Sequence, residues 1–137
     1  MRYLLDVNVL IAWGWQDHLE HDRAAAWIAD CKRDRGTTVL TSAIPQLGFV
    51  RVSVQRAVGR LAIREAAEAL AGMLNSLAGT HEFLPDDVSS TLLPGWCVSA
   101  SRTTDAHLVS LANHHQAELA TLDEGIVGAF VLPTLAR

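Results

Sequence analysis

The sequence predicts a single α/β domain over residues 1–137, built around a mostly parallel sheet. Short β-like segments alternate along the chain with longer helical patterns, and this alternation is typical of strands joined through helices. The chain contains neither an internal repeat nor a linker, and its 137 residues match the size of one domain. A chain of this size buries about 68% of the surface that it exposes when unfolded, so we expect it to fold without disulfides or a structural metal.

The first third of the chain predicts a strand, a helix and a second strand. Residues 3–5 form a short apolar strand that ends at Asp6. Residues 18–34 follow as an amphipathic helix, because apolar side chains lie on one face and charged side chains on the other. Residues 37–41 are β-branched or apolar and predict the second strand.

The middle of the chain predicts two helices and a third strand. Ser42 is a suitable N-cap for a helix that carries Pro45 in its first turn, where the missing N–H of proline removes no hydrogen bond. A further helix is expected over residues 63–77, which are rich in Ala, Glu and Leu. Residues 81–84 then predict the third strand.

The last third of the chain predicts an irregular segment, a helix and two strands. Residues 86–102 are expected to be irregular. Thr104 is expected to be the N-cap of a helix over 105–115. Residues 119–122 and 129–132 predict the last two strands, which brings the expected number of strands to five.

Composition and cysteine usage narrow the class of protein. Half of the residues are hydrophobic and 19% are charged, which excludes disordered and low-complexity chains. No apolar run approaches the roughly 18 residues of a membrane span. The two cysteines, Cys31 and Cys97, are too few for a metal framework, and nothing in the sequence indicates export. We therefore expect a soluble, cytoplasmic protein with no membrane association.

The net charge of −4 argues against a strongly basic protein that coats nucleic acid. The distribution of charge along the chain is more informative. Residues 35–64 contain five arginines and no acidic residue. Arg56, Arg60 and Arg64 are spaced by four, so on one helix they would line a single face. Guanidinium groups pair bidentately with phosphate oxygens, and this row is a candidate RNA-binding surface. A solvated helix face would show the same spacing.

Three aspartates are expected to meet at one edge of the sheet. Asp6 ends the first strand, Asp123 follows the fourth, and Asp105 opens the helix between them. In open α/β sheets, ligands bind outside the carboxyl ends of the strands, where the strand order reverses. Three neighbouring carboxylates repel one another unless a cation compensates, and oxygen ligands without Cys or His suit Mg²⁺ or Mn²⁺. This arrangement points to hydrolysis of a phosphodiester. Each aspartate alone also fits a turn or a helix cap.

Five segments spread over nearly the whole chain carry a resemblance to one family. They are 5–12 (LDVNVLIA), 18–27 with its two histidines and Trp27, 47–52 (LGFVRV), 104–112 (TDAHLVSLA) and 119–125 (LATLDEG). In this order and spacing they resemble the motifs of PIN-domain nucleases, and specifically the VapC toxins of bacterial toxin–antitoxin pairs. Each motif alone is weak, and the specificity lies in the ordered set of five.

The resemblance implies a three-layer α/β/α fold, Mg²⁺- or Mn²⁺-dependent endoribonuclease activity on RNA, inhibition by a VapB antitoxin, and a homodimer. Asp6, Asp105 and Asp123 match the acidic metal-site positions of the family. Asn8 and Thr104 match polar positions beside them, and we expect these two side chains to support the carboxylates through hydrogen bonds.

The middle motif departs from the family at Gln46, where a catalytic glutamate is usual. An amide keeps one carbonyl acceptor but loses the negative charge and the ability to act as a base. Three outcomes follow from this: three carboxylates suffice, Glu124 beside Asp123 supplies the missing charge, or this copy is impaired. We expect retained activity.

Two other functions compete with the nuclease hypothesis. A phosphotransferase of the haloacid-dehalogenase type also places an Asp at the end of the first strand, but here Asn8 stands where the second Asp of that motif belongs. A PIN fold that binds RNA or an antitoxin without cleavage is the alternative that Gln46 favours.

Arg102, three residues before Asp105, is expected to contact an RNA phosphate.

Overall fold

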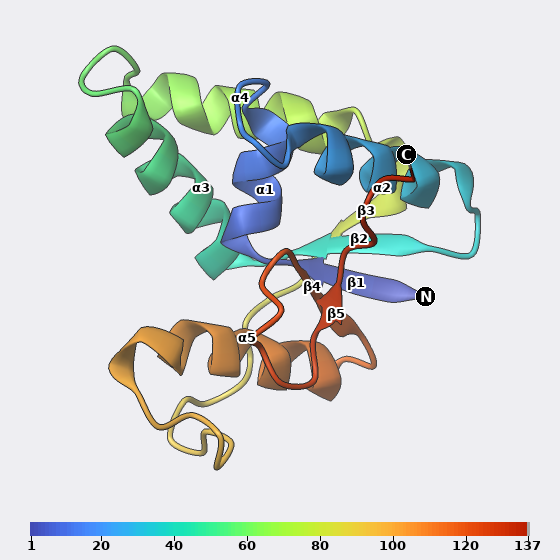
Figure 1. Cartoon of the computed structure of the whole chain (residues 1–137), viewed down its shortest axis with the longest axis vertical. Helices are drawn as coiled ribbons and strands as arrows, with labels where there is room; N and C mark the ends of the chain where they lie inside the picture. Colours follow the sequence, from blue (N-terminus) through green and yellow to red (C-terminus); the bar gives the residue numbers. More distant parts are fainter. Residues whose placement is uncertain (137) are drawn as a thin grey trace.

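The computed structural model describes residues 1–136, and in this range five strands and five α-helices form three layers (Figure 1). The strands are β1 (Arg2–Leu5), β2 (Thr38–Thr41), β3 (His81–Phe83), β4 (Glu118–Thr121) and β5 (Phe130–Val131). The helices are α1 (Val7–Gly14), α2 (His21–Arg33), α3 (Ala43–Arg56), α4 (Ile63–Asn75) and α5 (Thr103–His114). Helices α1 to α4 cover one face of the sheet and α5 covers the other, which confirms the predicted α/β/α fold.

The sheet has the order β3-β2-β1-β4-β5, and every pairing in it is parallel. The chain moves outward from β1 to β3 and then returns across the sheet to β4. Crossovers between parallel strands are right-handed, so the reversal of direction places α5 on the face opposite to α1–α4. The strand order therefore switches between β1 and β4, and the carboxyl ends of these two neighbours form the crevice at which α/β sheets bind ligands.

Successive residues of the central strands belong to two separate cores. Leu4 and Leu40 are fully buried on the side of α5, while Leu5 and Val39 are fully buried on the side of α1 and α2. Both faces are covered, so consecutive residues at the centres of β1 and β2 are apolar instead of alternating with polar residues. This two-sided burial holds the carboxyl ends of β1 and β4 in place.

Helix α1 is an element that the sequence analysis did not predict. The segment Val7–Gly14 is almost wholly apolar and directly follows β1 without a turn residue such as Gly or Pro. The helix starts because the Asp6 side chain caps it, with Oδ1 accepting a hydrogen bond from the Val9 backbone N–H at 2.8 Å. The same carboxylate thus ends the strand and begins the helix.

The predicted row of arginines on one helix face is wrong. Arg56 is the last residue of α3, Arg60 lies in the following turn, and Arg64 lies in the first turn of α4. The helix ends here because Val58 and Gly59 adopt left-handed backbone conformations, with φ angles of 47° and 78°. The three guanidinium groups therefore belong to three different elements.

The predicted cap of α5 is also wrong. The helix begins at Thr103, after a 3₁₀ turn over Ala100–Arg102, and Arg102 occupies the N-cap position. The Thr103 hydroxyl donates to the Ala100 carbonyl at 2.9 Å, which ties the helix to this turn. Thr104 lies inside the first turn with its side chain exposed, so it caps nothing.

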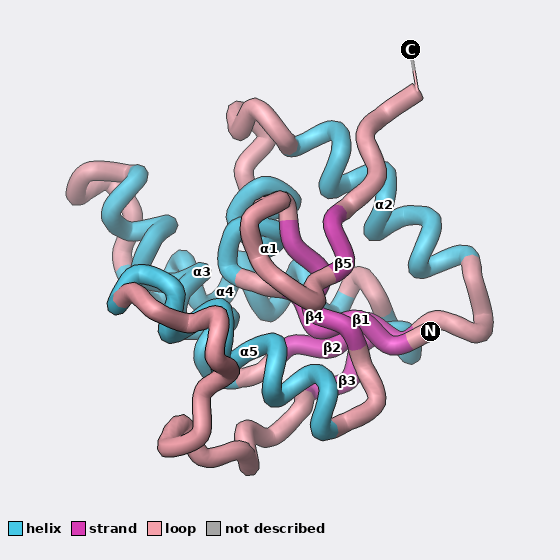
Figure 2. Tube along the Cα trace, turned by 60° about the horizontal axis from the view of Figure 1, so that its bottom comes forward, coloured by secondary structure: helices cyan, strands magenta, loops and turns pink. Residues whose placement is uncertain are grey.

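Residues 84–99 contain no helix or strand, in keeping with the predicted irregular segment. Figure 2 shows this segment as the long loop that leads from β3 to α5. Within residues 1–136, none of the helices combines the length and apolar character needed to cross a bilayer.

Candidate active site

The three aspartates, which we call the carboxylate cluster, lie at the switch point of the sheet. Asp6 directly follows β1, Asp123 lies two residues after β4, and Asp105 is in the first turn of α5. The negative charges of Asp105 and Asp123 both raise the pKa of Asp6, which shows that the three groups share one electrostatic environment. The fold thus brings together side chains that are up to 117 positions apart in the sequence.

Asp6 is the buried member of the cluster, with 3% of its surface exposed. Burial, with smaller contributions from the charges of Asp105 and Asp123, raises the pKa of Asp6 from 3.8 to about 6. Hydrogen bonds from the Thr121 side chain and the Val9 backbone act in the opposite direction. The carboxylate is held firmly in position, but its negative charge is poorly compensated.

Thr121 is a supporting residue that the sequence analysis missed. Its side chain is fully buried at the end of β4, bonds Asp6, and accepts a hydrogen bond from the Asp123 backbone N–H at 3.0 Å. One hydroxyl therefore links the two strand ends that carry Asp6 and Asp123. The available signal was the spacing Thr121-Leu122-Asp123, which places a hydroxyl two residues before an acid at a strand end.

Asp105 and Asp123 share the guanidinium group of Arg102. Nη1 of Arg102 lies 2.9 Å from Oδ2 of Asp123 and 3.5 Å from Oδ2 of Asp105. The Gly125 backbone N–H, which donates to Asp123 Oδ1 at 2.7 Å, together with Arg102 lowers the pKa of Asp123. Desolvation nevertheless raises the pKa of Asp105, and Arg102 only partly offsets it. Among residues 1–136, Arg102 is thus the cation paired with the cluster.

The donor set of the carboxylate cluster fits a hard divalent cation. All three side chains offer carboxylate oxygens, which Mg²⁺ and Mn²⁺ prefer, and the raised pKa of Asp6 marks a charge that a cation would stabilise. Among the described residues, the three carboxylates do not offer one oxygen each within 4.8 Å of one another. The Arg102 guanidinium instead bridges Asp105 and Asp123. Binding of a cation would therefore draw the three side chains together and compete with Arg102.

The structure does not support the expected roles of Asn8 and Thr104. Both side chains are exposed, and among residues 1–136 neither makes a hydrogen bond to a carboxylate of the cluster. Asn8 is the second residue of α1 and faces solvent, while the hydrogen bonds to Asp6 come from Val9 and Thr121. Glu124 follows Asp123 with an exposed side chain, so its assistance stays a prediction.

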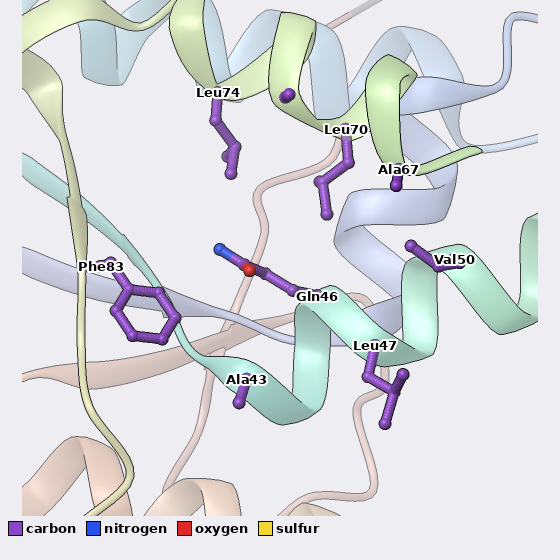
Figure 3. A pocket seen from close by; sticks show the side chains of 9 residues that line it. Ala43, Gln46, Leu47, Val50, Ala67, Leu70, Leu74 and Phe83 are labelled. Carbon is purple, nitrogen blue, oxygen red and sulfur yellow. The ribbon is translucent and has the colours of Figure 1, made fainter. Parts of the chain in front are cut away.

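Gln46 lies in the first turn of α3, and among the described residues its amide makes no hydrogen bond to the carboxylate cluster. Its Nε2 donates to the Thr41 hydroxyl at 2.9 Å, and that hydroxyl also bonds His81 Nε2 at 2.7 Å. Figure 3 shows the amide among the apolar side chains of Leu70 and Phe83, in a groove between α3 and α4. The amide thus satisfies a local polar network, which a carboxylate in its place would have to rearrange.

The arginines of residues 56–64 are separate from the carboxylate cluster. Arg56 stacks over Trp15, with its guanidinium carbon 4.9 Å from the ring centroid, and pairs with Asp17 at 3.1 Å. Arg64 pairs with Glu68 at 3.3 Å along α4. The turn between the two helices lies one length of α3, roughly 20 Å, from the sheet edge where that helix begins. Of the four arginines predicted to bind RNA, Arg102 is the one inside the site.

Comparison with known proteins agrees with this arrangement. Residues 3–128 match the PIN domain family. The chain is 37% identical over 133 residues to Ribonuclease VapC39 of Mycobacterium tuberculosis, an alignment that covers 92% of this chain and 91% of the relative. It is also 38% identical over 133 residues to Ribonuclease VapC44 and 37% identical over 131 residues to Ribonuclease VapC38 of the same organism, with 89% and 86% of those chains covered. The chain therefore belongs to the PIN domain family and, within it, to the VapC proteins.

Proposed function

We propose that this protein is a divalent-metal-dependent endoribonuclease that acts as the toxin of a toxin–antitoxin pair. The observation that carries the proposal is the carboxylate cluster at the switch point, where the buried Asp6 has a pKa raised to about 6. The ribonuclease names of the relatives support hydrolysis of RNA as the reaction. Asp6, Asp105 and Asp123 would hold Mg²⁺, or Mn²⁺ in its place.

Each residue of the site has a task that follows from its contacts. Asp6 is fixed by the start of α1 and by Thr121, so its carboxylate is oriented before any ligand arrives. Asp123 is fixed by the Gly125 N–H. Arg102 is half-exposed and can turn from the carboxylates toward a phosphate oxygen of RNA. A divalent cation would make water a better nucleophile and offset the charge that develops on the phosphate.

The proposal includes a partner and a location. A nuclease of this kind is held inactive by a cognate antitoxin, so we propose a VapB-like antitoxin as the partner, and a homodimer as the assembly. Both would act in the cytoplasm, where the RNA substrates are. These parts of the proposal rest on membership among the VapC proteins.

The primary test is cleavage of a mixed tRNA and mRNA pool by the purified protein. We expect cleavage with Mg²⁺ or Mn²⁺ and none in EDTA, because the cluster needs a cation to bring its carboxylates together. Cleavage that continues in EDTA would contradict the metal dependence. Absence of cleavage with either metal would favour the alternative, a PIN fold that binds without cutting.

Replacement of Gln46 separates an active enzyme from an impaired copy. We expect the natural chain to cleave RNA, and Gln46→Glu to change the half-saturating Mg²⁺ concentration by less than about tenfold. The reason is that the Gln46 amide bonds the Thr41 hydroxyl and, among the described residues, makes no hydrogen bond to the three aspartates. Cleavage that appears only in Gln46→Glu would show that the natural copy is silenced. Gln55→Glu, at the exposed end of α3, controls for the added charge.

Replacement of Arg102 tests its two proposed contacts at once. In Arg102→Gln, we expect the half-saturating Mg²⁺ concentration to fall a few-fold, because the incoming cation no longer competes with a partly exposed ion pair. The KM for RNA should rise, because a phosphate contact is lost. Metal titration and RNA titration of the cleavage rate measure the two effects separately. Arg33→Gln, an exposed arginine on α2, should change neither value.

A further inference from the structure

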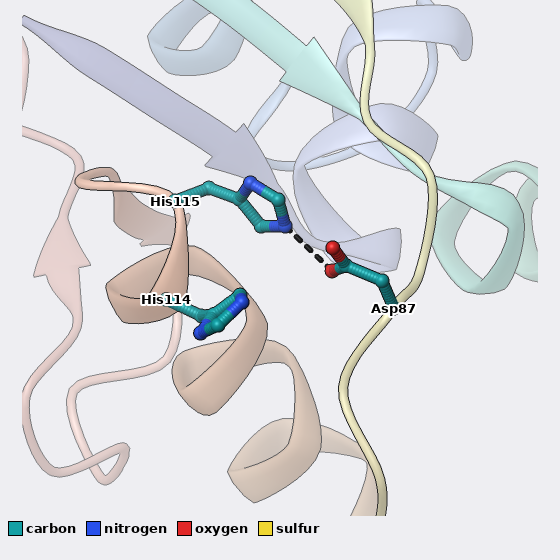
Figure 4. A group of neighbouring side chains, drawn as sticks. All are labelled: Asp87, His114 and His115. Atoms are coloured by element: carbon teal, nitrogen blue, oxygen red, sulfur yellow. Dashed lines mark hydrogen bonds and ion pairs between the residues drawn. The ribbon is translucent and has the colours of Figure 1, made fainter.

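A second group of metal-ligating side chains lies at the other end of α5 from Asp105. His114 is the last residue of this helix, His115 is its C-cap, and Asp87 comes from the loop after β3. Figure 4 shows the three side chains facing one another, with the His115 Nε2 atom 2.6 Å from Asp87 Oδ1. One ligand atom from each residue lies within 4.8 Å of the other two. We call this group the imidazole cluster.

The chemistry of the imidazole cluster differs from that of the carboxylate cluster. Two imidazoles and one carboxylate form a donor set that suits Zn²⁺ and neighbouring transition metals, whereas Mg²⁺ prefers oxygen ligands alone. The cluster lies at the C-terminal end of a 12-residue helix, where the partial negative charge of the helix dipole favours a cation. Three protein ligands would leave a fourth position open to water. We propose that Asp87, His114 and His115 bind a transition-metal ion of the Zn²⁺ type.

The geometry permits this with small side-chain movements. Zinc lies about 2.0–2.1 Å from nitrogen and oxygen ligands in tetrahedral geometry, so two ligand atoms on one ion lie about 3.3–3.4 Å apart. The ligand atoms lie within 4.8 Å of one another, so the widest pair must close by up to about 1.4 Å, while the His115 and Asp87 atoms, now 2.6 Å apart, must separate. Asp87 and His114 are exposed, so their side chains can rotate without disturbing the core.

The backbone at Asp87 is already fastened to α5 by the preceding residue. Asp86 Oδ2 lies 2.6 Å from Nε2 of the buried His107, and Nδ1 of His107 bonds Ser90 Oγ at 2.9 Å. These contacts hold the loop against the helix two turns before the imidazole cluster. A bound ion would add a third attachment between this loop and the helix end. The rise from Asp105 to His114 is roughly 13 Å, so the ion would not share ligands with the carboxylate cluster.

The test is titration of the full chain with Zn²⁺ in the presence of excess Mg²⁺, which occupies the carboxylate cluster and competes poorly for imidazole. We expect calorimetry to show one equivalent of Zn²⁺ bound, and the melting temperature to rise on binding. His114→Ala and Asp87→Asn should each weaken Zn²⁺ binding by at least about tenfold, since even the loss of a residue that supports a ligand costs that much. His18→Ala, a histidine outside the cluster, is the matched control.

The outcomes are separable from those that test the proposed nuclease. His114→Ala is expected to keep the Mg²⁺-dependent cleavage rate of the natural chain, because His114 touches none of the three aspartates. The proposal is overturned if the natural chain binds no Zn²⁺ under these conditions. It is equally overturned if His114→Ala and Asp87→Asn bind Zn²⁺ as tightly as His18→Ala does.

Discussion

Asp6→Asn is expected to abolish RNA cleavage and, at the same time, to make the metal-free protein more stable at neutral pH. The loss of activity follows from the position of Asp6 at the carboxyl end of β1, next to β4, where it is the buried and most firmly held carboxylate. An amide cannot supply the negative charge that a divalent cation requires. We expect the cleavage rate to fall by at least about 10²-fold, the range found when a charge-stabilising group is removed from an active site.

The gain in stability follows from the pKa of Asp6. Folding raises this pKa from 3.8 to about 6, so the folded state accommodates protonated Asp6 at a lower free-energy cost than ionised Asp6. The favourable contribution of Asp6 to the free energy of unfolding is fully present below about pH 4 and is lost as the pH rises through about 6. A difference of about two pKa units corresponds to about 3 kcal/mol. The asparagine avoids this penalty and keeps the oxygen that accepts from Val9, so the helix cap is retained.

Two measurements check this prediction. Denaturant unfolding in EDTA at pH 8 should show Asp6→Asn more stable than the natural chain by about 1–3 kcal/mol, and the difference should shrink toward pH 4. Mg²⁺ should stabilise the natural chain and leave Asp6→Asn unchanged. Asp30→Asn, an exposed aspartate on α2, should alter neither cleavage nor stability. Full cleavage by Asp6→Asn would exclude the proposed active site.

Gly48→Ala is expected to destabilise the protein by about 1–3 kcal/mol, although alanine is the better helix former. Gly48 lies in α3 against Val7 of α1. A Cβ atom at position 48 would lie 2.4 Å from Cγ2 and 3.1 Å from Cγ1 of Val7. Valine is restricted in χ1, so the two helices must separate to relieve the overlap. Because Val7 directly follows Asp6, we expect the separation to disturb the carboxylate cluster and to reduce cleavage as well.

A matched glycine in α4 separates the effect of packing from that of helix propensity. Gly72 has no atom within 4 Å of the position that a Cβ would take, so Gly72→Ala should stabilise the protein by up to about 1 kcal/mol. Val7→Ala removes both Cγ atoms, and the double variant with Gly48→Ala should recover much of the lost stability. Unfolding experiments on the natural chain, Gly48→Ala, Val7→Ala and the double variant measure the coupling between positions 7 and 48. Equal effects of Gly48→Ala and Gly72→Ala would contradict a close contact between the helices.

Arg56, Arg60 and Arg64 illustrate where sequence reasoning stops. Their spacing is that of one helix face, and nothing in the residue types of this segment forbids a continuous helix apart from Gly59. The helix ends because the backbone at Val58 and Gly59 turns into the left-handed region, which lets α4 pack against α3. Arg102 shows the converse. The sequence predicted that Arg102 binds phosphate. Only the packing of α5 beside the end of β4 showed that its guanidinium pairs with Asp105 and Asp123 in the structure.

The sequence by itself determined the strands, the order of the motifs and the positions of the three aspartates, since these depend on local apolar patterns and on residues at strand ends. The sequence did not predict helix α1, because an apolar segment after a strand has no periodicity that distinguishes a buried helix from a buried strand. Only the tertiary structure decided which polar groups meet: Thr121 with Asp6, Gln46 with Thr41, and Asp87 with His115. These pairings depend on how parallel strands and crossing helices place distant side chains, and no local pattern records that geometry.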